Sequence, residues 1–286
     1  MLLLTGVTGK TGGASAQALL KKGVPLRAIV RNADKAESLK AAGVELIIGD
    51  VTDQAVLERA MTGVDKALMT LPNGEKQLEL EKQFVDVAKA QGVKHLVKMS
   101  SMEASPDAKS PIARIHYASE QYLQKSGLAW TMMKPNFFMQ NFLGSAGTIK
   151  EQGKFFLPMG EGRTVMADTR DVGACVAAVM TGKGHEGQKY EITGPEVLSF
   201  ADAAARFSAV LGRKIEYVPV PMKAYRPTLA RFLTNEWHLN AVCELFQEIA
   251  EGETPHTTDA VQTLTGKPPI SFEQFVRDHK AVFTAV

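Results

Sequence analysis

The sequence predicts a doubly wound α/β fold, in which helices cover both faces of a mostly parallel β-sheet. Three observations support this prediction. Through the first half of the chain, short apolar runs alternate with longer segments of helical periodicity. The apolar runs show little polar alternation, as expected of parallel strands that are covered on both faces. A glycine-rich turn follows the first apolar run and leads into a helical segment.

Each strand is identified as an apolar run bounded by turn-forming residues, and each helix by apolar residues at helical spacing. Connections between parallel strands are expected to be right-handed. Strands are expected at Leu2–Thr5, Leu26–Val30, Val44–Ile48, Lys66–Thr70, His95–Ser100, Trp130–Lys134 and Tyr190–Thr193. Helices are expected at Ala14–Lys22, Glu75–Gln91 and Ile112–Lys125.

The regular alternation ends after Pro135. Residues 144–162 are expected to form turns, and a helix is expected to start near Asp171. Phe200–Leu211 and Tyr225–Ala250 have helical patterns, and prolines punctuate this part of the chain.

The chain is expected to form two lobes. The larger is a dinucleotide-binding domain over residues 1–150, to which residues 165–194 return as part of the sheet. The smaller is a mostly helical, C-terminal substrate lobe built from residues 195–286 together with 137–164. Such a lobe would close over the carboxyl ends of the strands, where open α/β sheets bind ligands.

Composition excludes several classes of protein. Of the 286 residues, 45% are hydrophobic and 22% are charged, as in ordinary globular proteins. The net charge of +2 gives no broad basic face, so no direct nucleic-acid partner is expected. Cys175 and Cys243 lie in apolar stretches, which favours free thiols over a disulfide or a metal site. Neither a signal peptide nor an apolar run of roughly 20 residues is found, so we expect a cytoplasmic protein without a membrane partner. Monomer and homodimer are equally compatible with the sequence.

The glycine-rich turn is the strongest functional signal. It reads Gly6-Val7-Thr8-Gly9-Lys10-Thr11-Gly12 and stands between a strand and a helix. Gly6 can take a tight turn, Gly9 lets backbone N–H groups approach a pyrophosphate, and Gly12 lets the helix pack closely on the strand. The helix N-terminus offers unpaired amides and a partial positive charge to an anion. This context favours a dinucleotide site, and hence a Rossmann-type fold, over a purely structural turn.

The residue after the second strand predicts which dinucleotide binds. Arg31 stands where an NAD-selective site usually carries an acidic residue for the ribose diol. A guanidinium there can hold a 2′-phosphate through two parallel hydrogen bonds, and Lys35 and Lys10 can add positive charge. We therefore expect NADP(H) rather than NAD(H). The alternative is that Arg31 is a solvated residue at a strand end.

Further motifs extend over nearly the full chain. Together with the glycine turn they resemble the NmrA-like group of atypical short-chain dehydrogenases, and within it small bacterial NAD(P)H-dependent reductases of quinones, azo dyes and triphenylmethane dyes. The motifs are Val30-Arg31-Asn32 with Lys35, Gly49-Asp50-Val51, His116-Tyr117-Ala118-Ser119-Glu120, Lys134-Pro135-Asn136-Phe137-Phe138-Met139, Asp168-Thr169-Arg170-Asp171 and the segment Phe272–Phe283.

The resemblance implies where ligands lie. Asp50 and Val51 would lie beside the adenine, although Asp50 has an alternative near a helix N-cap. Ser100-Ser101 and Pro135-Asn136-Phe137 would lie near the nicotinamide, although Pro135 can simply end a strand. The cofactor contacts expected are Gly6, Thr8, Gly9, Lys10, Thr11, Gly12, Arg31, Lys35, Asp50, Val51, Thr70, Leu71, Pro72, Ser100, Lys134, Pro135, Asn136 and Phe137. The substrate contacts expected are Met102, Phe138, Met139 and Phe142, for which ordinary core packing is the alternative.

The standard proton relay of short-chain dehydrogenases is absent or rebuilt. That relay uses a tyrosine with a lysine four residues later, which lowers the tyrosine pKa. Here Gln121 follows Tyr117 at that spacing, and an uncharged side chain cannot lower a phenol pKa from about 10. Tyr117, His116 and Ser101 are the candidate catalytic residues, although the first two have an alternative as surface residues of the helix Ile112–Lys125.

Hydride transfer to an acceptor that is already electrophilic needs mainly proximity and alignment. The sequence therefore predicts an NADPH-dependent reductase of a flat, conjugated small molecule of the quinone, azo or triphenylmethane type. One alternative is a redox sensor that binds NADP(H) without catalysis, as the resemblance allows. The missing tyrosine–lysine pair favours the sensor, whereas the tail Gly266–Phe283 opposes it because its aromatic residues suit closure of a substrate pocket. The other alternative is an imine or enone reductase of natural-product metabolism.

Overall fold

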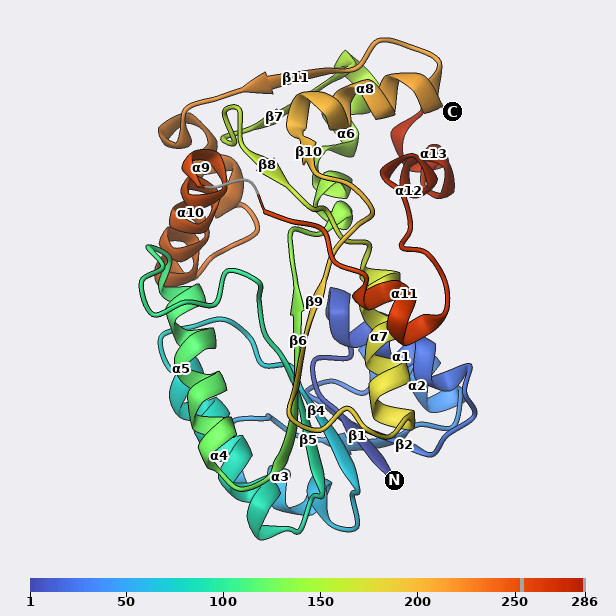
Figure 1. The fold of residues 1–286 in the computed structure, drawn as a ribbon, viewed down its shortest axis with the longest axis vertical. Helices are drawn as coiled ribbons and strands as arrows, with labels where there is room; N and C mark the ends of the chain where they lie inside the picture. The colour runs from blue at the N-terminus through green and yellow to red at the C-terminus, as the bar shows by residue number, and fades with distance from the viewer. Residues whose placement is uncertain (253–254, 285–286) are drawn as a thin grey trace.

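The computed structural model describes residues 1–252 and 255–284 and contains a seven-stranded parallel sheet (Figure 1). Its strands are β1 Leu2–Leu4, β2 Leu26–Val30, β3 Glu45–Ile48, β4 Lys66–Met69, β5 His95–Met99, β6 Ala129–Pro135 and β9 Gln188–Ile192. They lie in the order β3-β2-β1-β4-β5-β6-β9, so the order reverses beside β1. This is the doubly wound, Rossmann-type sheet that the sequence predicts, with strand ends displaced by one or two residues at most.

Helices cover both faces of the sheet because successive strand residues point to opposite sides. In β1, Leu2 and Leu4 belong to one apolar cluster, and Leu3 belongs to the other. The first cluster is covered by α1 Lys10–Leu20, η1 Asp34–Ala36, α2 Glu37–Ala41, α7 Thr169–Thr181 and α11 Ala260–Thr265. The second is covered by α3 Gln54–Met61, α4 Gln77–Ala90 and α5 Pro111–Lys125.

An upper lobe, residues 139–164, 198–251 and 272–283, stands above the carboxyl ends of the strands (Figure 1). It contains two small sheets, one antiparallel between β8 and β10 and one parallel between β7 and β11. Its elements are η2 Met139–Ser145, α6 Ala146–Gln152, β7 Lys154–Leu157, β8 Arg163–Thr164, β10 Leu198–Ser199, α8 Phe200–Leu211, β11 Glu216–Pro219, α9 Met222–Ala230, α10 Glu236–Glu251, α12 Phe272–Asp278 and α13 Lys280–Phe283.

Two expectations for this lobe are wrong. Residues 144–162, expected as turns, form α6 and β7, because Gly153 ends the helix in a left-handed conformation and the strand follows at once. The single helix expected at Tyr225–Ala250 is two helices, because the Asn235 side chain accepts a hydrogen bond from the His238 N–H and starts α10.

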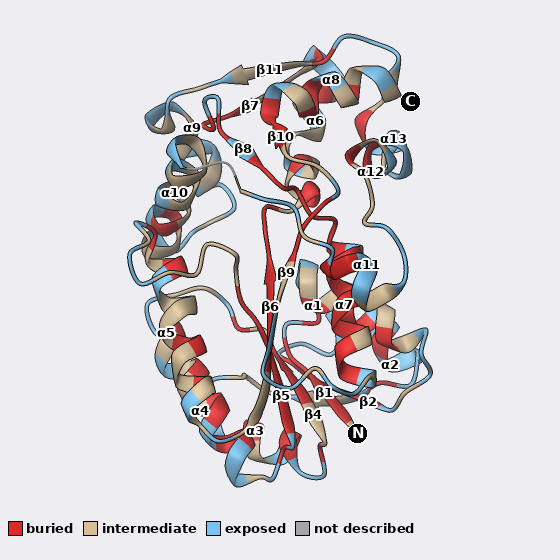
Figure 2. Cartoon of the chain, in the orientation of Figure 1, coloured by how far each residue is buried: buried red, intermediate tan, exposed pale blue. Residues whose placement is uncertain are grey.

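The core of the upper lobe is a cluster of phenylalanines, which Figure 2 shows as buried segments above the sheet. Phe142 is 1% exposed, and its ring centroid lies 5.1 Å from that of Phe272 and 5.2 Å from that of Phe155. Phe275 and Phe283 are also fully buried. The aromatic residues of the tail therefore stabilise the lobe from inside and do not close over a pocket, which corrects the expectation for Gly266–Phe283.

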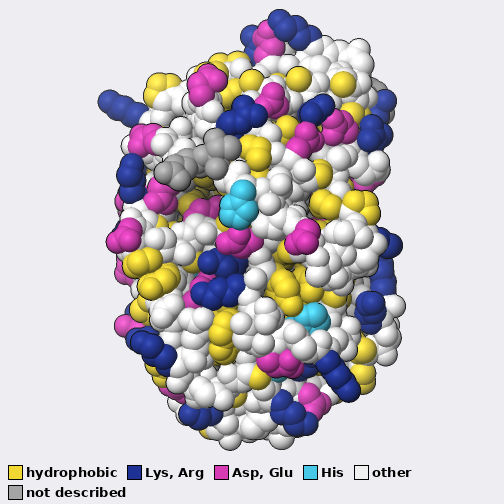
Figure 3. Space-filling model, in the orientation of Figure 1, with side chains coloured by type: hydrophobic (Ala, Val, Ile, Leu, Met, Phe, Trp, Pro, Cys, Tyr) yellow, Lys and Arg dark blue, Asp and Glu magenta, His cyan; other side chains and the backbone are white. Residues whose placement is uncertain are grey.

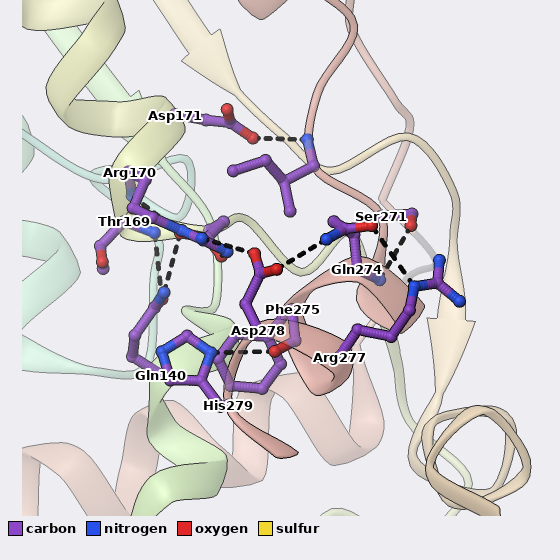
Figure 4. A network of polar contacts seen from close by, with 12 residues as sticks. Gln140, Thr169, Arg170, Asp171, Ser271, Gln274, Phe275, Arg277, Asp278 and His279 are labelled. Carbon is purple, nitrogen blue, oxygen red and sulfur yellow. Dashed lines mark hydrogen bonds and ion pairs between the residues drawn. The ribbon is translucent and has the colours of Figure 1, made fainter. Parts of the chain in front are cut away.

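A polar network joins the upper lobe to the N-terminus of α7 (Figure 4). The buried Asp168 carboxylate caps α7, accepts a hydrogen bond from Gln140 of η2 and pairs with Arg170 at 2.8 Å. Arg170 also pairs with Asp278 of α12 at 2.6 Å. Asp171 accepts a hydrogen bond from the Ile270 N–H at 2.7 Å. These contacts fix the last helices against the domain that carries the sheet.

The surface shows mixed charge. On the face drawn in Figure 3, basic and acidic side chains are interspersed over most of the surface, and one small group of cations near the centre adjoins acidic side chains. None of the helices in residues 1–252 and 255–284 combines the length and apolar character needed to cross a membrane. The same residues contain no group of three or more His, Cys, Asp or Glu side chains arranged to hold a metal ion.

Candidate functional site

The glycine turn makes a close connection between β1 and α1. Gly6 has a φ of +68°, in the left-handed region that favours glycine, and its carbonyl accepts a hydrogen bond from the Gly9 N–H at 2.8 Å. A Cβ at Gly12 would lie 2.3 Å from the Gly6 carbonyl oxygen, so no larger residue fits there. α1 begins at Lys10 rather than at Ala14, and no side chain caps this end. The N–H groups of its first turn are therefore free to bind an anion.

Thr5 and Thr70 connect the ends of β1 and β4 beside this turn. Thr5 Oγ1 lies 3.0 Å from the Leu68 carbonyl oxygen and accepts a hydrogen bond from the Thr70 N–H at 2.8 Å. Thr70 packs against Gly6, where a Cβ would lie 2.9 Å from the Thr70 carbonyl oxygen. Among the described residues, the buried Thr70 Oγ1 has no hydrogen-bond partner. A ligand that supplies one would remove this cost, so the site fits the cofactor that the sequence predicts.

Arg31 and Asp50 lie near one another at the carboxyl ends of β2 and β3, whose last residues are paired. The Asp50 carboxylate accepts a hydrogen bond from the Thr52 N–H at 2.9 Å. This hydrogen bond lowers the pKa of Asp50 against the effect of burial, and the Arg31 guanidinium lowers it further. The helix N-cap is Asp53, not Asp50. Within the described chain, the exposed side chains of Arg31 and Lys35 form no ion pair, so both are available to a ligand phosphate.

Lys10 is directed away from Arg31. Its Nζ donates a hydrogen bond to Asn141 Oδ1 of η2 at 2.8 Å, which links the glycine turn to the upper lobe. η2 follows β6, and β6 lies on the opposite side of β1 from β2. The structure therefore does not bring Lys10 together with Arg31 and Lys35. A role for Lys10 is expected instead near the pyrophosphate, close to its own helix N-terminus.

A buried polar layer lies beneath the ends of β5 and β6. Glu120 of α5 is 1% exposed, accepts a hydrogen bond from Ser100 Oγ at 2.5 Å, and lies 3.6 Å from Lys134 Nζ. Lys189 Nζ of β9 lies 3.2 Å from the other oxygen of Glu120. The two predicted cofactor contacts Ser100 and Lys134 are thus positioned by the same carboxylate. Their contact with the cofactor stays a prediction.

His116 lies beside a second ion pair, which is buried and joins Lys98 to Glu81. Lys98 Nζ lies 2.5 Å from Glu81 Oε2, and His116 Nδ1 lies 3.4 Å from the same Nζ. Burial, together with the charge of Lys98, lowers the pKa of His116 to about 3. The imidazole is therefore neutral at neutral pH and accepts from the ammonium, which does not support a role as proton donor. The neighbouring Tyr117 is half-buried, and its hydroxyl makes no hydrogen bond within the described residues.

A cavity of about 890 Å³ opens between the carboxyl ends of β5 and β6 and the helix α10. Two side chains at its wall, Glu103 and Asn136, come from the loops that follow these strands. Asn136 Nδ2 donates a hydrogen bond to Glu103 Oε1 at 2.8 Å, and the Ser101 hydroxyl is hydrogen-bonded to the other oxygen of Glu103. The lining residues are Glu103, Ser105, Asp107, Ala108, Lys109, Asn136, Arg163, Thr164, Glu248, Ile249, Glu251, Gly252 and Pro255.

The apolar residues predicted to contact substrate do not line this cavity. Met139 and Phe142 are 1% exposed and belong to the core of the upper lobe, so Phe142 is core rather than pocket lining. Phe138 packs against the cluster beneath α1 and α7, because it pairs with Ala167 as the chain leaves β6. Met102 is half-buried, and its N–H donates to the Pro135 carbonyl at 3.1 Å. Most of the residues that line the cavity are polar or charged, although apolar atoms supply most of its exposed surface.

Sequence reasoning missed Glu103, Glu120 and Glu81. Glu120 lies within a motif that was recognised, but its ion pairs join α5 to two strands and cannot be read from spacing. Glu103 had a usable signal, because it is an acidic residue two positions after Ser101 in a loop assigned to the nicotinamide end of the site. Lys98 carried a second signal, since a lysine in the middle of an apolar strand requires a buried partner.

The fold, the glycine turn and the free cations after β2 define a dinucleotide-binding protein of the Rossmann class. The model of the NmrA-like family matches residues 1–275, so the chain belongs to this family. The chain is 36% identical to the NAD(P)H azoreductase of Xenophilus azovorans over 285 residues, which cover 100% of each chain. A solved NADPH complex of an Escherichia coli NADPH-dependent quinone oxidoreductase is 26% identical, with a TM-score of 0.86 and coverage of 97% of this chain and 99% of that one. The NADP(H) complex of a Citrobacter sp. triphenylmethane reductase gives the same values.

Proposed function

We propose that the protein is an NADPH-dependent reductase that transfers hydride to a flat, conjugated small molecule of the quinone, azo or triphenylmethane type. The observation that carries this proposal is the placement of four features at the carboxyl ends of neighbouring parallel strands. They are Arg31 after β2, the glycine turn after β1, the Thr70 hydroxyl after β4, which has no partner among the described residues, and the cavity after β5 and β6. The activities of the azoreductase, quinone oxidoreductase and triphenylmethane reductase relatives support the choice of acceptor.

Different residues would bind different parts of the cofactor. The backbone amides of the first turn of α1 would bind the pyrophosphate, and Arg31 and Lys35 would bind the 2′-phosphate. Thr70 Oγ1 would donate to the middle of the cofactor, which removes its cost of burial. When bound, NADPH supplies the hydride. Asn136 stands at the cavity wall on a rigid strand end and would position the acceptor for transfer.

The test is to follow NADPH absorbance with quinones, azo dyes and triphenylmethane dyes, and to measure NADPH affinity separately by titration. Acceptor-dependent oxidation of NADPH is expected with at least one class, with a background rate close to zero when the acceptor is omitted. Tight NADPH binding without turnover of any acceptor on the panel would reject the proposal that the protein is a reductase.

A redox sensor is the second candidate, favoured by one observation. Gln121 replaces the lysine of the usual relay, and its amide bonds only to Gln124 at 3.1 Å within the described part of the chain. A protein that only senses the cofactor does not need a proton donor. Tight NADP(H) binding without turnover is the result that would select this candidate.

A further inference from the structure

Glu103 lines the cavity in which the acceptor would be reduced. The tyrosine–lysine relay of short-chain dehydrogenases has no residue that corresponds to it. Glu103 follows β5 in the loop that carries Ser100 and Ser101, and it lines the cavity below α10. Its two carboxyl oxygens are bonded to Ser101 and to Asn136, which come from the ends of two adjacent strands. A carboxyl held from both sides at the edge of a sheet is well placed for proton transfer.

The hydrogen bonds around Asn136 determine how Glu103 is oriented. Asn136 Oδ1 accepts from the Thr164 hydroxyl and from the Val165 N–H at 3.3 Å, so the amide must present Nδ2 to Glu103. Glu103 Oε1 is therefore an acceptor, and a proton on the carboxyl belongs on Oε2, beside Ser101. In the structure the Ser101 hydroxyl donates to Oε2 and accepts from the Glu103 N–H at 3.3 Å. When Oε2 carries a proton, the hydroxyl can accept from it and has its own hydrogen free to donate to a ligand.

The electrostatic surroundings favour the acid form. Burial raises the pKa of Glu103 above its ordinary value, and the negative charge of Glu248 on α10 adds to the rise, while Ser101 and Lys134 oppose it. Glu248 Oε2 is itself buried and without a partner among the described residues. Other charged groups facing the cavity are Asp107, Lys109, Arg163 and Glu251.

We infer that Glu103, acting through the Ser101 hydroxyl, donates the proton that accompanies hydride transfer to an acceptor. This inference rests on the proposed reductase function. With an azo acceptor, one nitrogen gains hydride from NADPH, and the other gains a proton from the Ser101 hydroxyl. Glu103 then returns a proton to Ser101. The N=N double bond becomes an N–N single bond with two new N–H bonds, NADPH becomes NADP⁺, and the Glu103 carboxylate regains a proton from water. The Tyr117 phenol and the neutral His116 are not used.

The acceptors themselves supply a control. Reduction of a triphenylmethane dye cation forms one C–H bond by hydride transfer alone, whereas reduction of an azo bond or a quinone also needs a proton. Glu103→Gln should therefore lower kcat with an azo dye by about 100-fold, as expected for loss of a general acid, and change the rate with the dye cation by less than about threefold. Gln can still accept from Asn136 and donate to Ser101. Glu244→Gln, on the exposed side of α10, controls for the loss of one negative charge and should leave both rates unchanged.

Two further measurements keep the inference testable if Glu103→Gln does not fold. In the wild type, the azo-reductase rate should fall as pH rises through the pKa of Glu103 and should show a solvent deuterium isotope effect, whereas reduction of the dye cation should show neither. Ser101→Ala should lower the azo rate in the same way, and the double variant should be no slower than either single variant.

The outcomes separate the inference from the function on which it rests. Equal losses with both acceptors, unchanged rates with both, or a wild type that reduces only the dye cation would each overturn the role of Glu103 while the reductase stands. A wild type that binds NADPH and reduces none of the acceptors would overturn the reductase, and the proton donor with it.

Discussion

Selectivity for NADPH should depend on Arg31 more than on any other single side chain. Replacing it with alanine removes a guanidinium that is exposed and makes no ion pair within the described residues. No ion-pair partner is therefore left behind in the variant, and the loss of affinity reports mainly the ligand contact. Removal also leaves the charge of Asp50 uncompensated next to the bound phosphate.

The magnitude follows from the type of contact. A hydrogen bond to a charged group contributes roughly 1.5–3 kcal/mol, and each 1.4 kcal/mol is about tenfold in affinity. Because solvent screens an exposed cation, the contribution of Arg31 should fall below the upper end of this free-energy range. Arg31→Ala should therefore raise the Kd for NADPH by about 10- to 100-fold, and Arg31→Glu by more, because an acidic residue repels the phosphate.

The assay is a titration of purified protein with NADPH and, in parallel, with NADH. The NADH affinity of Arg31→Ala should change by less than about threefold, since NADH lacks the 2′-phosphate. Lys35→Ala serves as the matched control and should cost less, because an ammonium offers no bidentate contact. If Arg31→Ala weakens both nucleotides equally, the guanidinium does not recognise the 2′-phosphate and the selectivity argument fails.

Three further predictions concern the turn and the stability of the fold. Gly12→Ala should abolish NADPH binding and destabilise the protein, because its Cβ would meet the Gly6 carbonyl at 2.3 Å; a variant that binds normally in the titration would contradict this. Phe142→Ala should lower the free energy of unfolding by about 3–5 kcal/mol in urea titration, as for a core phenylalanine, whereas a pocket-lining residue would mainly change KM. Burial raises the pKa of Asp171 to about 6 from an unfolded value of 3.8, so the folded state binds the proton more tightly and loses stability as pH rises between these values. Asp171→Asn keeps an acceptor for the Ile270 N–H and should gain roughly 1–2 kcal/mol over the wild type at pH 8 but not at pH 3.5; a gain independent of pH would rule out this account.

Local sequence patterns were enough for the sheet and for the anion-binding turn. Parallel strands are covered on both faces, so each is a short apolar run whose ends can be read directly, as in Leu26–Val30. Arg31 could be placed because it follows such a strand without an intervening loop. The helix expected from Ala14 begins earlier in the structure, at Lys10, because the close approach between Gly12 and Gly6 lets the helix start within the glycine turn.

Other assignments needed distances that no local pattern contains. Phe138, Met139 and Phe142 follow a strand at the ligand-binding edge, but this position does not say whether a side chain turns toward a cavity or into the core of the next lobe. Asn235 is the N-cap of α10, but the helical pattern continues on both sides of it. The pattern therefore does not show that α9 and α10 are separate helices.

The doubly wound sheet, the family resemblance and the expected nucleotide can all be predicted from the sequence, because each depends on residues that are neighbours along the chain or stand at a fixed offset from a strand end. Three other findings required the folded chain: Phe142 is core, His116 is neutral beside Lys98, and Glu103 joins Ser101 to Asn136. Burial and electrostatic pairing depend on which segments meet in space, and the segments that meet here are separated by whole strands and helices.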